Sequence, residues 1–173
     1  MTVYIKEIKV SSTGGQATFS NISQEVKDII KQSGVSKGTC TVVSPHTTCA
    51  VLYEEYTHDA DENNVELLHL DLDDALMKIA PPHNNAATYR YPGPEHYKAV
   101  KEWPNYLEYL PGGDPKAIWN GDAHIKASII GASEILVINN NELAVGKTGY
   151  IYFIDFDTTR PRTRTCQVVV MGE

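Results

Sequence analysis

The sequence lacks several features that would each assign a class of protein. It has no apolar run near the roughly 20 residues of a membrane-spanning helix, so we expect no membrane contact. Its formal net charge of −7 argues against broad binding to nucleic acid or to a membrane surface. Three cysteines without a CxxC pair favour buried, reduced thiols over a disulfide framework. Residues 1–6 do not resemble the start of a secretory leader, and we therefore expect a cytoplasmic protein.

The patterns that are present predict one α+β domain over residues 1–173. Hydrophobic residues make up 42% of the chain and charged residues 21%, which is ordinary for a globular domain. The predicted order is two strands paired as a hairpin, a helix, two strands, a helix, a long loop, a helix and four strands, mostly antiparallel. The segments are residues 3–10, 16–20, 23–33, 38–44, 47–55, 59–80, 122–130, 135–138, 143–145, 150–157 and 163–171.

Residues 81–119 have a different composition from the rest of the chain. They hold seven of the nine prolines, five of the ten tyrosines and both tryptophans. Apart from a short helix expected at residues 96–103, they show no sustained periodicity. A long irregular stretch inside a compact domain is typical of a lid, a binding loop or an interface arm. Its aromatic content argues against plain disorder.

Two histidine motifs are the first candidate site. His46 lies in Ser-Pro-His-Thr-Thr-Cys-Ala, and His124 lies in Asn-Gly-Asp-Ala-His-Ile-Lys, each at the edge of a predicted element. Histidine and carboxylate side chains are usual ligands for zinc, and His96, His83, Asp122 or Asp61 could complete such a site. The spacing matches no metal signature such as HExxH. The alternative is a pair of structural histidines whose ring nitrogens bond the backbone.

The second candidate is an anion site at the start of the predicted helix, over residues 120–126. A helix N-terminus presents free N–H groups and a partial positive charge, which favour phosphate. Gly121 permits close approach of the backbone, and Lys126 follows one turn later. Asp122 would oppose a phosphate unless it holds a metal. The alternative is an ordinary helix capped by Asn120.

The third candidate is the run of arginines at residues 160–164. Alternation along a strand places Arg162 and Arg164 on one face, where they could clamp a phosphate. The alternative, which the residues alone favour slightly, is solvated charge on an edge strand that prevents aggregation.

Several motifs, in order along most of the chain, resemble the YjbQ family, which is associated with a secondary thiamine-phosphate synthase activity. The matching segments are residues 46–52 (HTTCAVL), 71–72, 80–81, 120–134 (NGDAHIKASIIGASE), 142–146 and 149–157 (GYIYFIDFD). This chain departs from the family pattern at residues 146–150 and in the long insertion at 81–119.

The resemblance implies a two-sheet β-sandwich flanked by helices, largely antiparallel, and a homotrimer with the histidines near a subunit boundary. It implies a divalent metal, zinc above all or magnesium for a diphosphate substrate, held by His46, His124 and His96. His46, His124 and Asp122 would then be catalytic. Lys126, Thr47, Asn120 and Gly121 would bind a small-molecule substrate, with or without a phosphate. The expected activity is thiamine-phosphate synthesis. The alternatives are a metal-dependent hydrolase of a phosphorylated small molecule and a non-catalytic metabolite-binding homotrimer.

Overall fold

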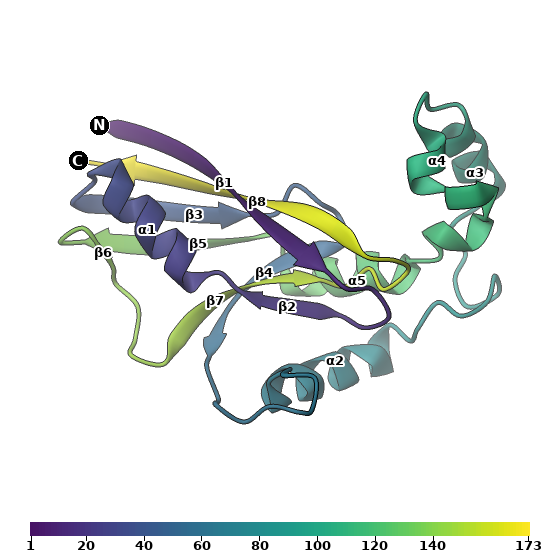
Figure 1. Ribbon diagram of the computed structural model, residues 1–173, viewed down its shortest axis with the longest axis horizontal. Coiled ribbons are helices and arrows are strands. Elements are labelled where there is room, and N and C mark those ends of the chain that lie inside the picture. The colour runs from purple at the N-terminus through teal and green to yellow at the C-terminus, as the bar shows by residue number, and fades with distance from the viewer.

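The computed structural model describes all of residues 1–173 as an α+β fold with two antiparallel sheets and five α-helices (Figure 1). The strands are β1 (Thr2–Ser12), β2 (Thr18–Asn21), β3 (Lys37–Val43), β4 (Cys49–Glu55), β5 (Ser133–Asn139), β6 (Glu142–Leu143), β7 (Gly149–Asp155) and β8 (Arg162–Gly172). The helices are α1 (Ser23–Ser33), α2 (Leu67–Ile79), α3 (Pro94–Lys101), α4 (Tyr106–Tyr109) and α5 (Gly121–Ile130), with short 3₁₀ turns at Pro111–Gly113 and Pro115–Ile118.

The first two strands do not form the predicted hairpin. β1 pairs along its whole length with β8 in a five-stranded sheet of order β1-β8-β3-β5-β6. β2 pairs with β7 in a three-stranded sheet of order β2-β7-β4. The loop between them carries the chain from one sheet to the other, and the Gly15 N–H donates to the Thr158 carbonyl at 2.8 Å. Pairing between residues distant in the sequence decided the partners of both strands.

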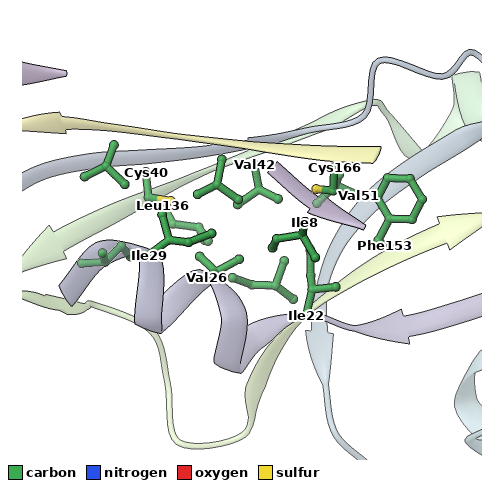
Figure 2. Packing of buried hydrophobic residues seen from close by; sticks show 14 of the residues in the cluster. Ile8, Ile22, Val26, Ile29, Cys40, Val42, Val51, Leu136, Phe153 and Cys166 are labelled. Atoms are coloured by element: carbon green, nitrogen blue, oxygen red, sulfur yellow. The ribbon is translucent and has the colours of Figure 1, made fainter. Parts of the chain in front are cut away.

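The main core lies between the five-stranded sheet, the three-stranded sheet and α1. Figure 2 shows Ile22, Val26 and Ile29, at and within α1, beside side chains of both sheets. Val26 and Phe153 are fully buried, and the three cysteines are buried and free, as the sequence predicted. α1 ends where expected, because Gly34 takes the left-handed conformation with φ of 70°.

α2 and α5 cover the other face of the three-stranded sheet. Leu76 of α2 and Ala123 and Ala127 of α5 pack with Ile154 and Phe156 in a second buried cluster. α2 begins at Leu67 and not at residue 59, because Asp61 makes a turn: its Oδ1 accepts the backbone N–H groups of Asn63 and Val65. α5 runs from Gly121 to Ile130 and ends before Gly131, close to the predicted bounds.

The insertion at residues 81–119 projects from one end of the sheets, opposite the two chain termini (Figure 1). Its helices α3 and α4 have a small core of their own made by Val100, Leu110 and Ile118. Arg160, just before β8, donates hydrogen bonds to the carbonyls of Glu108 and Ala117 and so ties the insertion to the sheets. No helix in the structure has both the length and the apolar surface needed to cross a membrane.

Candidate functional site

A cavity of about 330 Å³ opens where the insertion meets the ends of the sheets and α5. We call it the arginine cavity. Its apolar wall comes mainly from the insertion and comprises Pro45, Tyr91, Val100, Trp103, Tyr109 and Ile118. Its polar wall comprises His46, Thr47, Thr48, His96, Asn120, His124, Asp157, Arg160, Arg162 and Arg164. Seven of the site residues predicted from the sequence thus line one cavity: His46, Thr47, His96, Asn120, His124, Arg162 and Arg164.

His46 is positioned by the turn between β3 and β4. The Ser44 hydroxyl accepts the His46 backbone N–H at 3.1 Å, and the backbone N–H of Thr165 in β8 donates to His46 Nε2 at 3.0 Å. A nitrogen that accepts a hydrogen bond carries no proton, so the neutral ring has its proton on Nδ1. Burial lowers the pKa of His46, and the nearby Arg164 lowers it further. At neutral pH His46 therefore offers one N–H donor from Nδ1.

His124 lies one turn into α5, beside the aromatic ring of Tyr91 from the insertion. The two ring centroids are 5.4 Å apart, and the Tyr91 hydroxyl is 3.3 Å from His96 Nε2. Burial lowers the pKa of His124 and outweighs the opposing effect of Asp157. Tyr91 thus connects His124 to His96, and the insertion completes the wall that the two histidine motifs begin.

The three arginines differ in their partners. Arg164 is buried and donates two hydrogen bonds to Asp155, from Nε at 2.7 Å and from Nη2 at 3.0 Å. Arg162 pairs with Asp157. Arg160 has no carboxylate partner and donates only to two backbone carbonyls. Burial and then the charge of Arg162 lower the pKa of Arg160, although a guanidinium stays charged in proteins.

The arginines do not lie on an edge strand, as their sequence context had favoured. β8 is an inner strand, between β1 and β3, and Arg164 is buried. The alternating pattern did place Arg162 and Arg164 on one face, since both guanidiniums approach the same oxygen of Asp157. The cavity carries three guanidiniums against the carboxylates of Asp155 and Asp157. The positive charge of Arg160 is left without an acidic partner.

This arrangement fits an anion better than a divalent cation. Nowhere in the chain do three or more His, Cys, Asp or Glu side chains gather in a group that could hold a metal ion. His46 Nε2 already accepts the Thr165 N–H, and Asp157 accepts from Asn120, Thr159 and Arg162. Three guanidiniums would also repel a cation. Zinc on His46, His124 and His96 stays a prediction.

Lys126, Gly121 and Asp122, together with the further candidate ligands His83 and Asp61, lie outside the arginine cavity. Lys126, only 5% exposed, pairs with Asp73 of α2 at 2.7 Å. The Gly121 N–H donates to His83 Nδ1 at 3.2 Å, so this first N–H of α5 already has a partner. Asp122 lines a neighbouring cavity of about 460 Å³ with His83 and Trp119, and burial raises its pKa. The roles predicted for these residues stay untested predictions.

Sequence reasoning missed Asp155 and Asp157. Both belong to the apolar run that forms β7 and its end, and both are 2% exposed. Carboxylates are almost never buried without a partner, so two acidic residues at core positions two apart indicate basic partners. The arginine run shortly downstream supplies those partners. Both acidic residues are visible in the sequence, but they become informative only once the strand and its buried positions are known.

The family description "UPF0047 protein YjbQ-like" matches residues 6–173. The UPF0047 protein YugU of Bacillus subtilis (strain 168) is 28% identical over 152 residues, which cover 88% of each chain. The UPF0047 protein of Methanothermobacter thermautotrophicus is 24% identical over 173 residues, covering 100% of this chain and 95% of its own. The family match over residues 6–173 includes both histidine motifs, β7 and β8.

Solved structures agree with the fold. A YjbQ/UPF0047 protein of Clostridium acetobutylicum, described as uncharacterised, has 28% identity and a TM-score of 0.64, covering 95% of this chain and 99% of its own. A protein of unknown function from Sulfolobus solfataricus P2 has a TM-score of 0.68 at 22% identity, covering 99% and 98%. The second likeness concerns the fold alone. With the family description matching nearly its whole length, this chain belongs to the YjbQ-like UPF0047 family, whose function is uncharacterised.

Proposed function

We propose that the protein binds a phosphorylated small molecule in the arginine cavity and acts on it as a thiamine-phosphate-synthase-like transferase. The observation that carries the proposal is Arg160, a half-buried guanidinium that lines the cavity and has no carboxylate partner. Arginine is well suited to phosphate because its planar fork matches two phosphate oxygens. The insertion contributes aromatic and aliphatic side chains to the same cavity, which suits the organic part of the molecule.

The reaction implied by the family resemblance is consistent with this charge distribution. A ring nitrogen of a thiazole phosphate would form a C–N bond with the methylene carbon of a hydroxymethylpyrimidine diphosphate. The C–O bond to the diphosphate would break, and its electron pair would stay on the departing pyrophosphate. Arg160, Arg162 and Arg164 would stabilise that developing charge. The Nδ1–H of His46 would donate a further hydrogen bond to it.

Titration calorimetry on metal-free protein tests the binding step. We expect inorganic pyrophosphate to bind more tightly than inorganic phosphate, with an affinity that falls as salt rises, because exposed charges are screened. Absence of binding to either anion, in protein shown by circular dichroism to be folded, would reject the proposal.

Turnover assays then separate the reaction classes. Release of pyrophosphate that requires both thiamine precursors supports the transferase. Release of inorganic phosphate from a single phosphorylated substrate indicates a hydrolase, and binding without product indicates a metabolite-binding protein. Elemental analysis of the purified protein, before and after chelation, tests the zinc prediction.

We also propose that the chain assembles as a homotrimer through the outer face of the five-stranded sheet. Two rows of paired residues cross this face: Ile5, Val169, Thr41 and Ile135, and Val3, Met171, Thr39 and Val137. Ile135 is 69% exposed and Val137 is 57% exposed. Exposed apolar side chains gathered on one face in this way are typical of an interface. The same face leads along β8 to Thr165, which holds His46, so the arginine cavity lies at its end.

Changing Ile5 and Ile135 together to glutamate is expected to give monomers. Two carboxylates in one row of the face would repel each other and their counterparts across the interface. Light scattering coupled to gel filtration would show the mass falling from that of a trimer to 19.2 kDa. Ile129→Glu is the matched control, since Ile129 is an exposed residue of α5 and not of the sheet. A double variant that stays trimeric would exclude this face as the interface.

A further inference from the structure

Asn120 carries a buried hydrogen-bond acceptor that no protein group satisfies. Its side chain lines the arginine cavity and the residue is only 7% exposed. The amide nitrogen Nδ2 donates to Asp157 Oδ2 at 2.8 Å, whereas the oxygen Oδ1 is buried without a hydrogen-bond partner. Native proteins leave few such atoms unsatisfied, and an exception calls for an explanation.

The orientation of this amide is fixed by its neighbour. An amide side chain can usually be rotated to exchange its oxygen and nitrogen. Here Asp157 prevents the exchange, because an ionised carboxylate only accepts hydrogen bonds. Burial alone would raise the pKa of Asp157, but Arg162 and the hydrogen bonds from Thr159 and Asn120 outweigh burial and lower it. Asp157 therefore stays ionised and takes the nitrogen, so that Oδ1 remains the free atom.

Asn120 also lies next to the groups proposed to bind the anion. Asp157 Oδ2 accepts from both Asn120 Nδ2 and Arg162 Nη1, so the amide and the guanidinium meet on one oxygen atom. A ligand held by the arginines would thus place its next few atoms near Asn120. A cationic amine there would be repelled by the three guanidiniums, whereas a neutral donor would not.

We propose that the ligand of the arginine cavity carries a neutral hydrogen-bond donor, a hydroxyl or an N–H group, within a few bonds of its phosphate, and that Asn120 Oδ1 selects for it. The inference rests on the proposed binding of a phosphorylated molecule and adds the chemistry of the group beside the phosphate. A ligand without this donor should bind more weakly, because the buried Asn120 oxygen would then stay unpaired.

Matched pairs of alkyl phosphates test the proposal in the metal-free protein. One compound of each pair carries a hydroxyl group: 2-hydroxyethyl, 3-hydroxypropyl or 4-hydroxybutyl phosphate. Their partners are the corresponding methyl ethers, which keep the oxygen but cannot donate. We expect at least one hydroxyl compound to bind about tenfold more tightly than its ether, the usual size of one hydrogen-bond difference. Calorimetry, or competition against pyrophosphate, measures the ratio.

Asn120→Leu keeps a similar volume and removes the acceptor, so the ratio should fall to about one. Asn63→Leu is the matched control: Asn63 is exposed and does not line the cavity, so this variant should keep the wild-type ratio. If Asn120→Leu fails to fold, the ratios measured on the wild-type protein decide alone. Equal affinities for every pair would overturn this inference and leave the anion site standing. Failure of all the phosphates, pyrophosphate included, would overturn the proposed function and this inference with it.

Discussion

Asp155→Ala is expected to lower the free energy of unfolding by about 3–5 kcal/mol, the usual cost of breaking a buried ion pair from one side. Asp155 is 2% exposed and accepts two hydrogen bonds from Arg164 and one from the Asp157 backbone N–H. Removing its carboxylate leaves the Arg164 charge buried, with the Thr48 hydroxyl at 3.1 Å and Asp157 Oδ2, which already pairs with Arg162, at 3.8 Å as its remaining partners. Urea unfolding followed by circular dichroism measures the loss.

Two further variants identify the cause. Glu7→Ala removes an exposed partner of Lys9 on the same sheet and should change stability by less than about 0.5 kcal/mol. The double change Asp155→Leu with Arg164→Met removes both charges and should recover much of the loss, because an apolar pair can replace a buried ion pair. A double variant no more stable than Asp155→Ala would show that the loss comes from packing and not from the Arg164 charge that has lost its main partner.

The surroundings of this ion pair could be predicted from the sequence only in part. Alternation placed Arg162 and Arg164 on one face, and that placement was right. It could not show that β8 would lie between β1 and β3, because strand order depends on pairing between distant residues. The edge-strand interpretation of the arginines therefore failed, although the local pattern had been read correctly.

Local signals were reliable where a single residue type decides the backbone. α1 and α5 end at Ser33 and Ile130, as their predicted ranges had it, and each is followed directly by a glycine, Gly34 or Gly131. Local signals failed where the same residue type is common in two different backbone structures. Asp61 looked like a residue of a helix first turn but makes hydrogen bonds to the backbone of its own turn, a common alternative for aspartate.

The candidate site was predictable only in part, where short motifs name its residues. His46, Thr47, Asn120 and His124 line one cavity, and family motifs had singled them out. Lys126, for which contact with an anion stays a prediction, pairs with Asp73, a partner 53 residues away that no local pattern could reveal. The contribution of the insertion was visible only as aromatic content, because Tyr91 reaches His124 through the tertiary fold.

Arg160→Ala is expected to weaken pyrophosphate binding by about ten- to a hundredfold. Hydrogen bonds to charged groups contribute about 1.5–3 kcal/mol, and each 1.4 kcal/mol corresponds to about a factor of ten. Arg160 is the one guanidinium of the cavity without a carboxylate partner, so its charge is the most available to a ligand. Calorimetric titration with pyrophosphate, at a fixed moderate salt concentration, measures the change.

The controls separate a ligand contact from a structural role, since Arg160 also holds the insertion through the carbonyls of Glu108 and Ala117. Lys147→Ala removes the same charge from a groove outside the arginine cavity and should alter affinity less than about twofold, because salt screens distant charges. Arg160→Lys keeps the charge but loses the planar fork, so its affinity should lie between wild type and Arg160→Ala. If Arg160→Ala is less stable yet binds pyrophosphate as wild type does, Arg160 serves to fasten the insertion, and the anion must be held by the other two arginines.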